Sequence, residues 1–341
     1  QETIYSVEEA YWNLVHSIEN LKVRQQSLKL AQDLLKKNKK AVEVGTLAPI
    51  EILSAQSAVA TREADILEAE AVLKDNEDRL KTIINLAAEE EGTELAKIIP
   101  LDKPAFEKKE VTLDEALRAA MDNRPDLRAT RIDLKNKELD VSYSSNQLLP
   151  NLSLNASYWS PGITGDQILY LNDNAFSGVM IGTIPGNASD ALKDAFNFKY
   201  KNWSVGITLD IPLNTFLSRA DYAQARVNLD QTMLRLKNQE QQLFLEIKNA
   251  VRAVQTDYKR VQAYKVAREL AVKTLEAEEE KLKVGITTPF FVLQYQTDLA
   301  TAQTNELKAT IDYNLSLARL NRAMGTSLKE KDIRFSKVLG G

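Results

Sequence analysis

Cysteine is absent from this sequence of 341 residues, and histidine occurs once, at His16. Without thiols the chain has no disulfides, no thiol nucleophile and no thiolate metal ligands. A lone imidazole with no second one to join it predicts a structural role for His16. The sequence also shows no nucleotide-binding loop, no nucleophile elbow and no catalytic carboxylate pair in a recognisable context. We therefore expect no enzyme, no cofactor and no metal.

Long apolar runs and an excess of basic residues are missing too. No stretch of about 18 apolar residues occurs, so the sequence predicts no membrane-spanning helix. Lysine and arginine number 44 against 48 acidic residues, and the net charge of −4 gives no basic surplus of the kind that nucleic-acid binding requires. The apolar share of 44% and the charged share of 27% are ordinary for a folded chain with room for more than one domain.

Glycine and proline are scarce, with 12 and 9 copies, and neither occurs from Ala220 to Val284. Apolar residues recur in this interval at steps of three and four, at Leu243, Ile247, Val251, Val254, Tyr258 and Val261. The spacing predicts one face of a helix. A single helix over the interval would be on the order of 100 Å long, which favours a rod, a coiled coil or a tall helical barrel.

Two similar stretches interrupt the helical pattern, VGTLAPIEIL at residues 44–53 and VGITTPFFVL at 284–293. A glycine after the valine can take the left-handed conformation that ends a helix, and the proline suits the start of the next one. Each stretch therefore predicts a helical hairpin tip. Residues 44–85 align with 284–325 without gaps, and 11 of 42 positions are identical, which we interpret as a duplicated hairpin. A chance match of two helices rich in alanine and leucine is the alternative.

The middle of the chain has a different pattern. Residues 86–111 are acidic and then proline-rich, and they predict a connecting segment. Thr112 with Glu115 three residues later is a capping-box pattern that predicts a helix start. Pro125 interrupts the pattern, and a further helix is expected to run to about Leu149.

The apolar period then changes to 2 in NLSLNASYW and NWSVGITLDIPL, which predicts two strands separated by an exposed loop at 161–202. Each strand is apolar on one face and small and polar on the other, with an aromatic residue at one end. This is typical of a transmembrane β-strand with an oily outer face, although a half-buried strand of a soluble sheet has the same pattern. The predicted lipid-facing residues are Leu152, Leu154, Tyr158, Val205, Ile207 and Leu209.

Five stretches together resemble the TolC family of outer membrane efflux proteins. They are the two tips with the helices after them, at 44–73 and 284–309, RPDL at 124–127, LPNLSLNASY at 149–158 and WSVGITLDIPLN at 203–214. The resemblance implies a mainly α fold with a small β part, in which long helical hairpins of a homotrimer form an α-barrel continuous with a transmembrane β-barrel. It implies a location in the bacterial outer membrane with a large periplasmic extension.

The implied function is that of the outer membrane channel of a tripartite efflux or type I secretion system. Its partners would be a periplasmic adaptor protein, an inner-membrane transporter and outer membrane lipid. The domains would be a first periplasmic hairpin at 1–85, an equatorial segment at 86–123, a helix leading to the barrel at 124–149, a transmembrane strand pair at 150–211 with 161–202 as extracellular loop, a second periplasmic hairpin at 212–325 and an equatorial tail at 326–341.

The sequence departs from the family in two places. No strand pair precedes the first tip, and three copies of two strands would give six, below the roughly eight strands of small barrels. We therefore expect a chain that lacks an N-terminal strand pair. The family often carries an acidic residue two positions after the proline of the tip. The first tip has Glu51 at this position, whereas the second tip has Phe291. The candidates for an entrance constriction are Glu51, Phe290, Phe291 and Gln294, with packing of the rings inside the hairpin as the alternative.

Two further sets of residues are predicted to act at the entrance. The tips carry small and apolar residues that would dock onto the adaptor, namely Val44, Gly45, Thr46, Leu47, Val284, Gly285, Ile286 and Thr287. Turn closure alone is the alternative for the glycines. In the repeat register Lys36, Lys39 and Lys40 align with Glu276, Glu279 and Glu280. Alternating basic and acidic hairpins would form a charge ring that helps to hold the entrance closed, and independent solvated faces are the alternative.

A structural coiled-coil scaffold without transport activity is the competing function. A channel needs detergent for solubility and forms pores in planar bilayers, whereas a scaffold is soluble without detergent and forms no pores. The sequence does not identify the exported solute, because a water-filled tunnel discriminates little between solutes and the inner-membrane pump provides most of the selectivity.

Overall fold

The computed structural model describes residues 1–86, 97–104, 106–211 and 215–333 of the chain. The backbone divides into two units. The hairpin unit comprises Gln1–Arg131 and Arg235–Gly341, and the strand unit comprises Ile132–Leu234.

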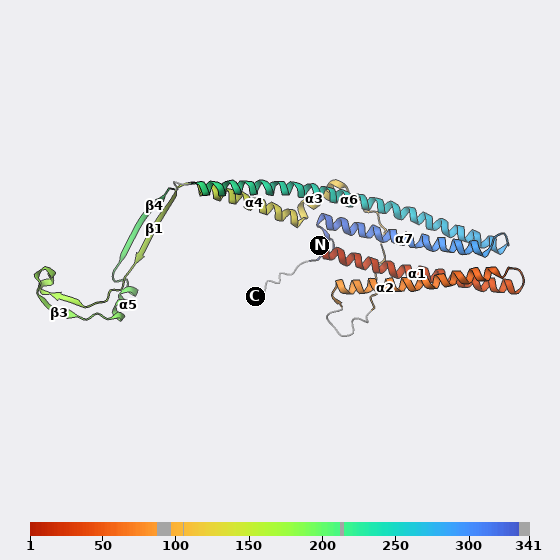
Figure 1. Ribbon diagram of the computed structural model, residues 1–341, viewed down its shortest axis with the longest axis horizontal. Helices are drawn as coiled ribbons and strands as arrows, with labels where there is room; N and C mark the ends of the chain where they lie inside the picture. Colours follow the sequence, from red (N-terminus) through yellow and green to blue (C-terminus); the bar gives the residue numbers. More distant parts are fainter. Residues whose placement is uncertain (87–96, 105, 212–214, 334–341) are drawn as a thin grey trace. The chain divides into compact units, whose positions relative to one another are not determined.

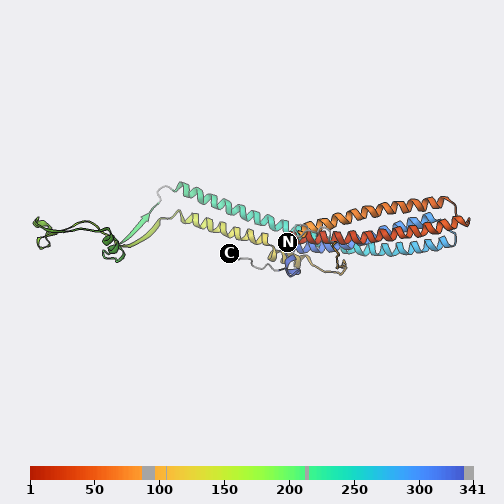
Figure 2. The same ribbon diagram turned by 90° about the horizontal axis from the view of Figure 1, so that it is seen from below.

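Four long helices form two antiparallel hairpins in the hairpin unit (Figures 1 and 2). The first hairpin consists of α1, Glu2–Glu43, and α2, Ile50–Ile83. The second consists of the later part of α6, Phe216–Lys283, and of α7, Pro289–Met324. The 68 residues of α6 confirm the uninterrupted helix expected from the lack of glycine and proline. Within the described residues, no helix combines the length and the apolar character that crossing a membrane requires.

α6 and α7 pack through the seam that the sequence predicts. Tyr258 is partly buried against the cluster that the seam forms with α7. Burying one leucine, isoleucine or valine side chain of the seam contributes about 1.5–3 kcal/mol, so the seam stabilises the second hairpin. The buried seam residues of α6 are Leu243, Ile247, Val251, Val254 and Val261, and they share this cluster with Ala309, Tyr313, Leu320, Ala323 and Met324 of α7.

Alanines let the two hairpins approach each other closely. Ala31 of α1 and Ala55 of α2 are fully buried, and they share one cluster with Leu275, Val292 and Leu293 of the second hairpin. Small side chains at a helix contact shorten the distance between the axes. The two hairpins lie side by side, with both tips at the same end of the hairpin unit (Figures 1 and 2).

α3, Leu113–Asn123, begins with the predicted capping box. The Thr112 hydroxyl accepts from the Glu115 amide at 3.3 Å, and the Glu115 carboxylate accepts from the Thr112 amide at 3.3 Å. α4, Pro125–Asn146, follows and ends just short of the expected boundary. A short helix, α8, Ser327–Glu330, comes after α7. Of the predicted connecting segment and tail, residues 87–96, 105 and 334–341 lie outside the described residues.

In the strand unit, β1, Asn151–Trp159, pairs antiparallel with β4, Asn202–Asp210, which confirms the two predicted strands. The connection between them, expected as an exposed loop at 161–202, contains short elements that the sequence did not predict. Its elements are β2, Gln167–Tyr170, two short 3-10 turns, η3, Leu171–Asp173, and η4, Ala175–Ser177, then β3, Met180–Ile184, and the helix α5, Ala188–Phe196. These elements are too short to show a clear period among so many turn residues.

Candidate functional site

The two tips close with the same backbone geometry. Gly45 has φ +77° and Gly285 has φ +75°, a region that residues with a Cβ rarely adopt. In each tip the amide after the glycine donates to the carbonyl five residues earlier, at 2.8 Å in the first tip and 3.0 Å in the second. This is the Schellman pattern of a helix end. α7 begins at Pro289 as predicted, and α2 begins directly after Pro49.

The tips expose apolar side chains at matching positions. Val44 is 73% exposed, Val284 69% and Ile286 77%. Leu47 and Thr287 are half-buried, and the Thr287 hydroxyl donates to the carboxylate of Glu278. The structure thus brings the predicted docking residues to one end of the unit, and the two valines and the isoleucine are the most exposed apolar side chains among them.

The candidates for an entrance constriction lie in two environments. Phe290 and Phe291 are each about half exposed, and their rings meet edge to face with centroids 5.6 Å apart. The rings are therefore not enclosed in the hairpin core. Gln294 is exposed and donates to Asp298 at 3.2 Å. Glu51 is partly buried, and within the described residues its Oε2 has no hydrogen-bond partner.

The predicted charge sets lie on the surfaces of different hairpins. Lys36, Lys39 and Lys40 are exposed. Glu276 and Glu280 are exposed as well, and Glu279 is half-buried. Among the described residues of one chain no ion pair joins the two sets, and Glu280 pairs with Lys283 of its own helix at 2.6 Å. Contact between the sets would therefore require a neighbouring copy.

A buried polar residue sits in the middle of each charge set, and sequence reasoning missed both. Asn38 is 3% exposed and donates to the carbonyl of Glu51 at 3.3 Å. Glu278, its equivalent in the repeat, is 6% exposed. Hydrogen bonds from Thr287 and then Lys281 lower the pKa of the Glu278 carboxyl. Each residue stabilises its tip through a hydrogen bond across the turn. Their equivalent positions in the two copies of the repeat were the sequence signal that could have predicted this role.

Arg62 of α2 joins three helices near the tips. One guanidinium nitrogen donates to the Ser27 carbonyl of α1 at 2.7 Å and to Gln296 Oε1 of α7 at 3.0 Å. The other donates to the Leu293 carbonyl at 3.2 Å and to the Thr297 hydroxyl at 3.3 Å. Burial lowers the pKa of Arg62. Arg62 lies seven residues after Ala55 and seven before Ala69, and both alanines are buried. This spacing places Arg62 on the same face of α2 as the alanines, and it could have predicted the burial of Arg62.

A groove of about 750 Å³ runs between α2 and α7 beside this arginine, and residues of α1 complete its lining. Its wall near the tips is apolar, with Leu53, Phe290 and Leu293. Further along, hydroxyl and amide side chains replace the apolar ones, and Arg24 pairs with Asp65 at 2.9 Å on its lining. The groove therefore offers an apolar end and a polar end to a partner.

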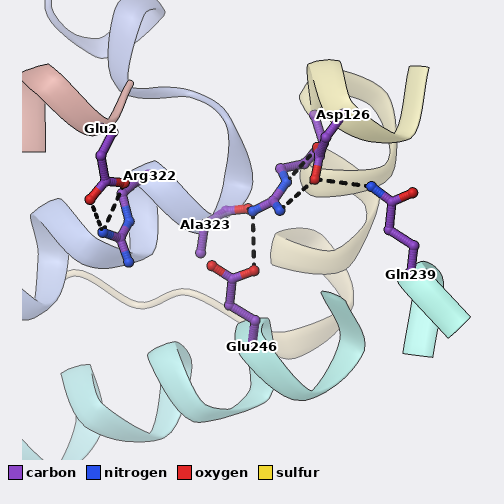
Figure 3. Close-up of polar contacts among 7 residues, drawn as sticks. Glu2, Asp126, Gln239, Glu246, Arg322 and Ala323 are labelled. Atoms are coloured by element: carbon purple, nitrogen blue, oxygen red, sulfur yellow. Dashed lines mark hydrogen bonds and ion pairs between the residues drawn. The ribbon is translucent and has the colours of Figure 1, made fainter. Parts of the chain in front are cut away.

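The RPDL stretch forms a junction of three helices (Figure 3). Arg124 donates to both carboxylate oxygens of Asp126, at 2.9 and 2.8 Å, and to Glu246 of α6 at 3.1 Å. It also donates to the carbonyl of Ala323 in α7 at 3.3 Å. Gln239 of α6 completes the junction by donating to Asp126 at 3.2 Å. The motif thus ties the start of α4 to the second hairpin.

The strand pair separates apolar from polar side chains, except that Trp159 at the end of β1 lies on the polar face opposite Asn202. The register pairs Leu152 with Leu209 and Leu154 with Ile207 on one face, which also carries Tyr158 and Val205. On the other face Ser157 and Ser204 share a hydrogen bond of 2.8 Å. All six predicted lipid-facing residues therefore lie on one face, and each is at least 56% exposed. Within the described residues each strand has one partner, which leaves one free edge per strand.

The chain is similar to known proteins over most of its length. A family model described as "Outer membrane efflux protein" matches residues 1–86 and 116–326. The chain is 25% identical over 342 residues to "Outer membrane protein TolC" of Vibrio cholerae serotype O1, covering 98% of the chain and 69% of the relative. It is 23% identical over 308 residues to "Nodulation protein T" of Rhizobium leguminosarum bv. trifolii, covering 90% and 59%.

A solved structure shares the fold. The Campylobacter jejuni CmeC outer membrane channel superposes with a TM-score of 0.68 at 16% identity, and the match covers 99% of this chain and 68% of that one. The chain thus spans between about three fifths and two thirds of the length of these relatives.

Proposed function

Because this chain belongs to the outer membrane efflux protein family, we propose that it forms the wall of a trimeric efflux tunnel together with two further copies. Its location is the bacterial outer membrane, with the two helical hairpins reaching into the periplasm. The family is one of transport channels, and the competing coiled-coil scaffold has no support among the relatives. Solutes would pass through the tunnel while partner proteins supply the energy.

One observation carries the proposal, namely the division of the strand pair into an apolar and a polar face. A strand that crosses lipid must satisfy its backbone groups by pairing, and a closed barrel does so without an edge. The free edges of β1 and β4 are available to pair with further strands, which such closure requires. The apolar face with Leu154 and Ile207 would then meet lipid, and the face with Ser157 and Ser204 would line the wet lumen.

The tips would dock onto a periplasmic adaptor that connects the tunnel to an inner-membrane transporter. The exposed Val44, Val284 and Ile286 support this role, because exposed apolar turns ordinarily bind a partner. The groove between α2 and α7 opens beside the same tips through Phe290 and Leu53, so an adaptor element could follow it away from the entrance.

Planar-bilayer recording of the detergent-purified protein tests the channel. We expect discrete, long-lived conductance steps, and chemical cross-linking should give a trimer. A matched variant with Leu154→Asp and Ile207→Asp should lose insertion, because charge on the lipid face is costly at the bilayer midplane. Ser153→Asp and Thr208→Asp on the opposite face should insert normally. Equal insertion of both variants, or a protein that is soluble without detergent and forms no pores, would reject the proposal.

A further inference from the structure

The connection between β1 and β4 is an ordered lobe, residues 160–201. Its backbones approach each other too closely for side chains at two crossing points. A Cβ on Gly162 would lie 2.1 Å from the carbonyl oxygen of Ala191, and one on Gly186 would lie 2.3 Å from that of Gly165. Such contacts require glycine, and they hold the β2–β3 ribbon and α5 in a defined arrangement.

The β2–β3 ribbon carries apolar side chains on both of its faces, beside one polar side chain on each, Gln167 and Thr183. One face carries Leu169 and Ile184, and the other carries Ile168, Tyr170 and Met180. Ile184 is 51% exposed, Ile168 40% and Met180 65%, so neither face is covered within the chain. A two-stranded ribbon by itself is only marginally stable in water. Both faces therefore need a covering surface.

The turn of the ribbon holds a phenylalanine outward. Phe176 is fully exposed, and its amide donates to the side chain of Asn174 at 3.0 Å. Asn172 and Asp173 just before it have left-handed backbones, with φ of +58° and +55°. Side chains other than glycine adopt this conformation at a cost, so the shape of the turn is specified. An aromatic ring presented in this way is suited to burial against a partner.

The charge around the β2–β3 ribbon argues against a membrane as that partner. Residues 161–192, which include the ribbon, contain Asp166, Asp173 and Asp190 but no lysine or arginine. The lysines of the lobe, Lys193, Lys199 and Lys201, all follow the ribbon, and Lys193 and Lys199 pair with Asp190 and Asp194. Anionic lipid surfaces attract basic segments, so this acidic segment gains nothing from them. A flat membrane would also cover only one face of the ribbon. In a closed ring of identical chains, by contrast, each copy has a neighbour on either side.

We propose that the β2–β3 ribbon is a self-association surface. The face with Leu169 and Ile184 of one copy packs on the face with Ile168 and Met180 of the next, and Phe176 is buried at this contact. The inference rests on the proposed trimer and adds to it a contact outside the barrel strands. Three lobes would then form a collar around the mouth of the tunnel.

The absence of cysteine makes a direct test possible. Phe176→Cys is introduced alone, and the trimer is treated with a short bismaleimide, first in detergent and then in phosphatidylcholine vesicles. We expect links between chains to form at least about tenfold faster than in Ile207→Cys, because neighbouring lobes have a high effective concentration. Ile207 is the control, since it lies on a strand whose copies would be separated around the barrel. Because the proposed channel places Ile207 against lipid, each cross-linking rate is divided by the rate at which the same variant is labelled by a monofunctional maleimide.

Adding Ile168→Ser and Ile184→Ser to Phe176→Cys should slow cross-linking towards the control rate while the trimer persists. A trimer in which Phe176→Cys reacts no faster than Ile207→Cys overturns the self-association and leaves the proposed channel standing. Cross-linking seen in detergent but lost in vesicles would mean that lipid covers the ribbon, and it would also overturn the inference. A protein that is not trimeric before any substitution removes the channel proposal and this contact together.

Discussion

The guanidinium of Arg62 on α2 donates a hydrogen bond of 3.0 Å to the side-chain oxygen of Gln296 on α7, and the two side chains are only 6% and 3% exposed. This contact joins the first hairpin to the second near the tips. The carbonyls of Ser27 and Leu293 that Arg62 also contacts belong to helices, where they accept backbone hydrogen bonds as well. Gln296 is therefore the acceptor that depends most on Arg62.

Arg62→Met should destabilise the protein by about 1–3 kcal/mol, because it leaves the buried Gln296 amide without its donor. The double variant Arg62→Met with Gln296→Met should recover most of that loss, since both polar partners are then removed together. Chemical denaturation in detergent, followed by circular dichroism, measures both. Arg79→Met is the matched control on the exposed side of the same helix, and it should change stability by at most about 0.5 kcal/mol. Additive losses in the double variant would contradict the coupling.

Arg124→Ala should cost about 1–3 kcal/mol, because the charged groups of Asp126 and Glu246 lose a shared partner. Arg124→Lys should recover only part of the loss, since an ammonium cannot make the two parallel bonds to Asp126. Thermal unfolding measures the ranking. Arg128→Ala, four residues on and exposed, is the control. Equal stability of the lysine variant and the unchanged protein would show that charge alone suffices at the junction.

His16 should make the protein less stable as the pH falls below about 6.5. Burial, and next the charge of Lys308, lower the pKa of His16 in the folded chain, while Asp312 opposes them. Between the lowered folded pKa and the unfolded value, the unfolded chain binds a proton that the folded chain does not, so stability is lost there. Comparing unfolding at pH 7.5 and 5.5 for the unchanged protein and His16→Gln isolates this effect. An identical loss in both proteins would refute it.

Ile286→Asp should abolish capture of the protein by its adaptor and leave the trimer intact, because a charge replaces a highly exposed apolar side chain of the tip. Leu47→Asp should act in the same direction, although Leu47 is half-buried and also supports the turn. Leu67→Asp, at an equally exposed position further along α2, is the control and should bind normally. Pull-down with the adaptor and native mass measurement separate the two effects. Normal export by the Ile286 variant would contradict a docking role.

Reversing the basic set, Lys36, Lys39 and Lys40, to glutamate should raise conductance, and more at low salt than at high salt. Acidic hairpins would then repel their acidic neighbours, and salt screens that repulsion. Changing Glu276, Glu279 and Glu280 to lysine in the same protein should restore the original conductance. Each exposed pair contributes only about 0–1 kcal/mol, so the effect depends on the ring. A double reversal that conducts like the single reversal would mean that the two sets do not interact.

The sequence by itself determined the elements whose signal is local. Glycine and proline at the two tips, the apolar period of α6, the capping box at Thr112 and the alternation of β1 and β4 each depend on residues within one or two turns or along one strand. All of these were confirmed. The family assignment followed from the same motifs in order and was also confirmed. The exposed loop expected at 161–202 stays a prediction, and its short strands and helix could not be predicted, because they carry too few residues to show a period.

Only the tertiary structure decided which polar residues are buried. The residues next to Arg62 in the sequence give no sign that it is buried. Arg62 nevertheless donates hydrogen bonds to Leu293 and Gln296, which lie 231 and 234 positions away in the chain. Glu278 looks like one more glutamate of an acidic run, and its burial depends on the turn that brings Thr287 back to it. A helical pattern fixes the face on which a side chain lies, but the partner on the facing helix comes from packing between segments distant in the chain. The tips and strands could therefore be predicted from the sequence, and the contacts that hold the hairpins together could not.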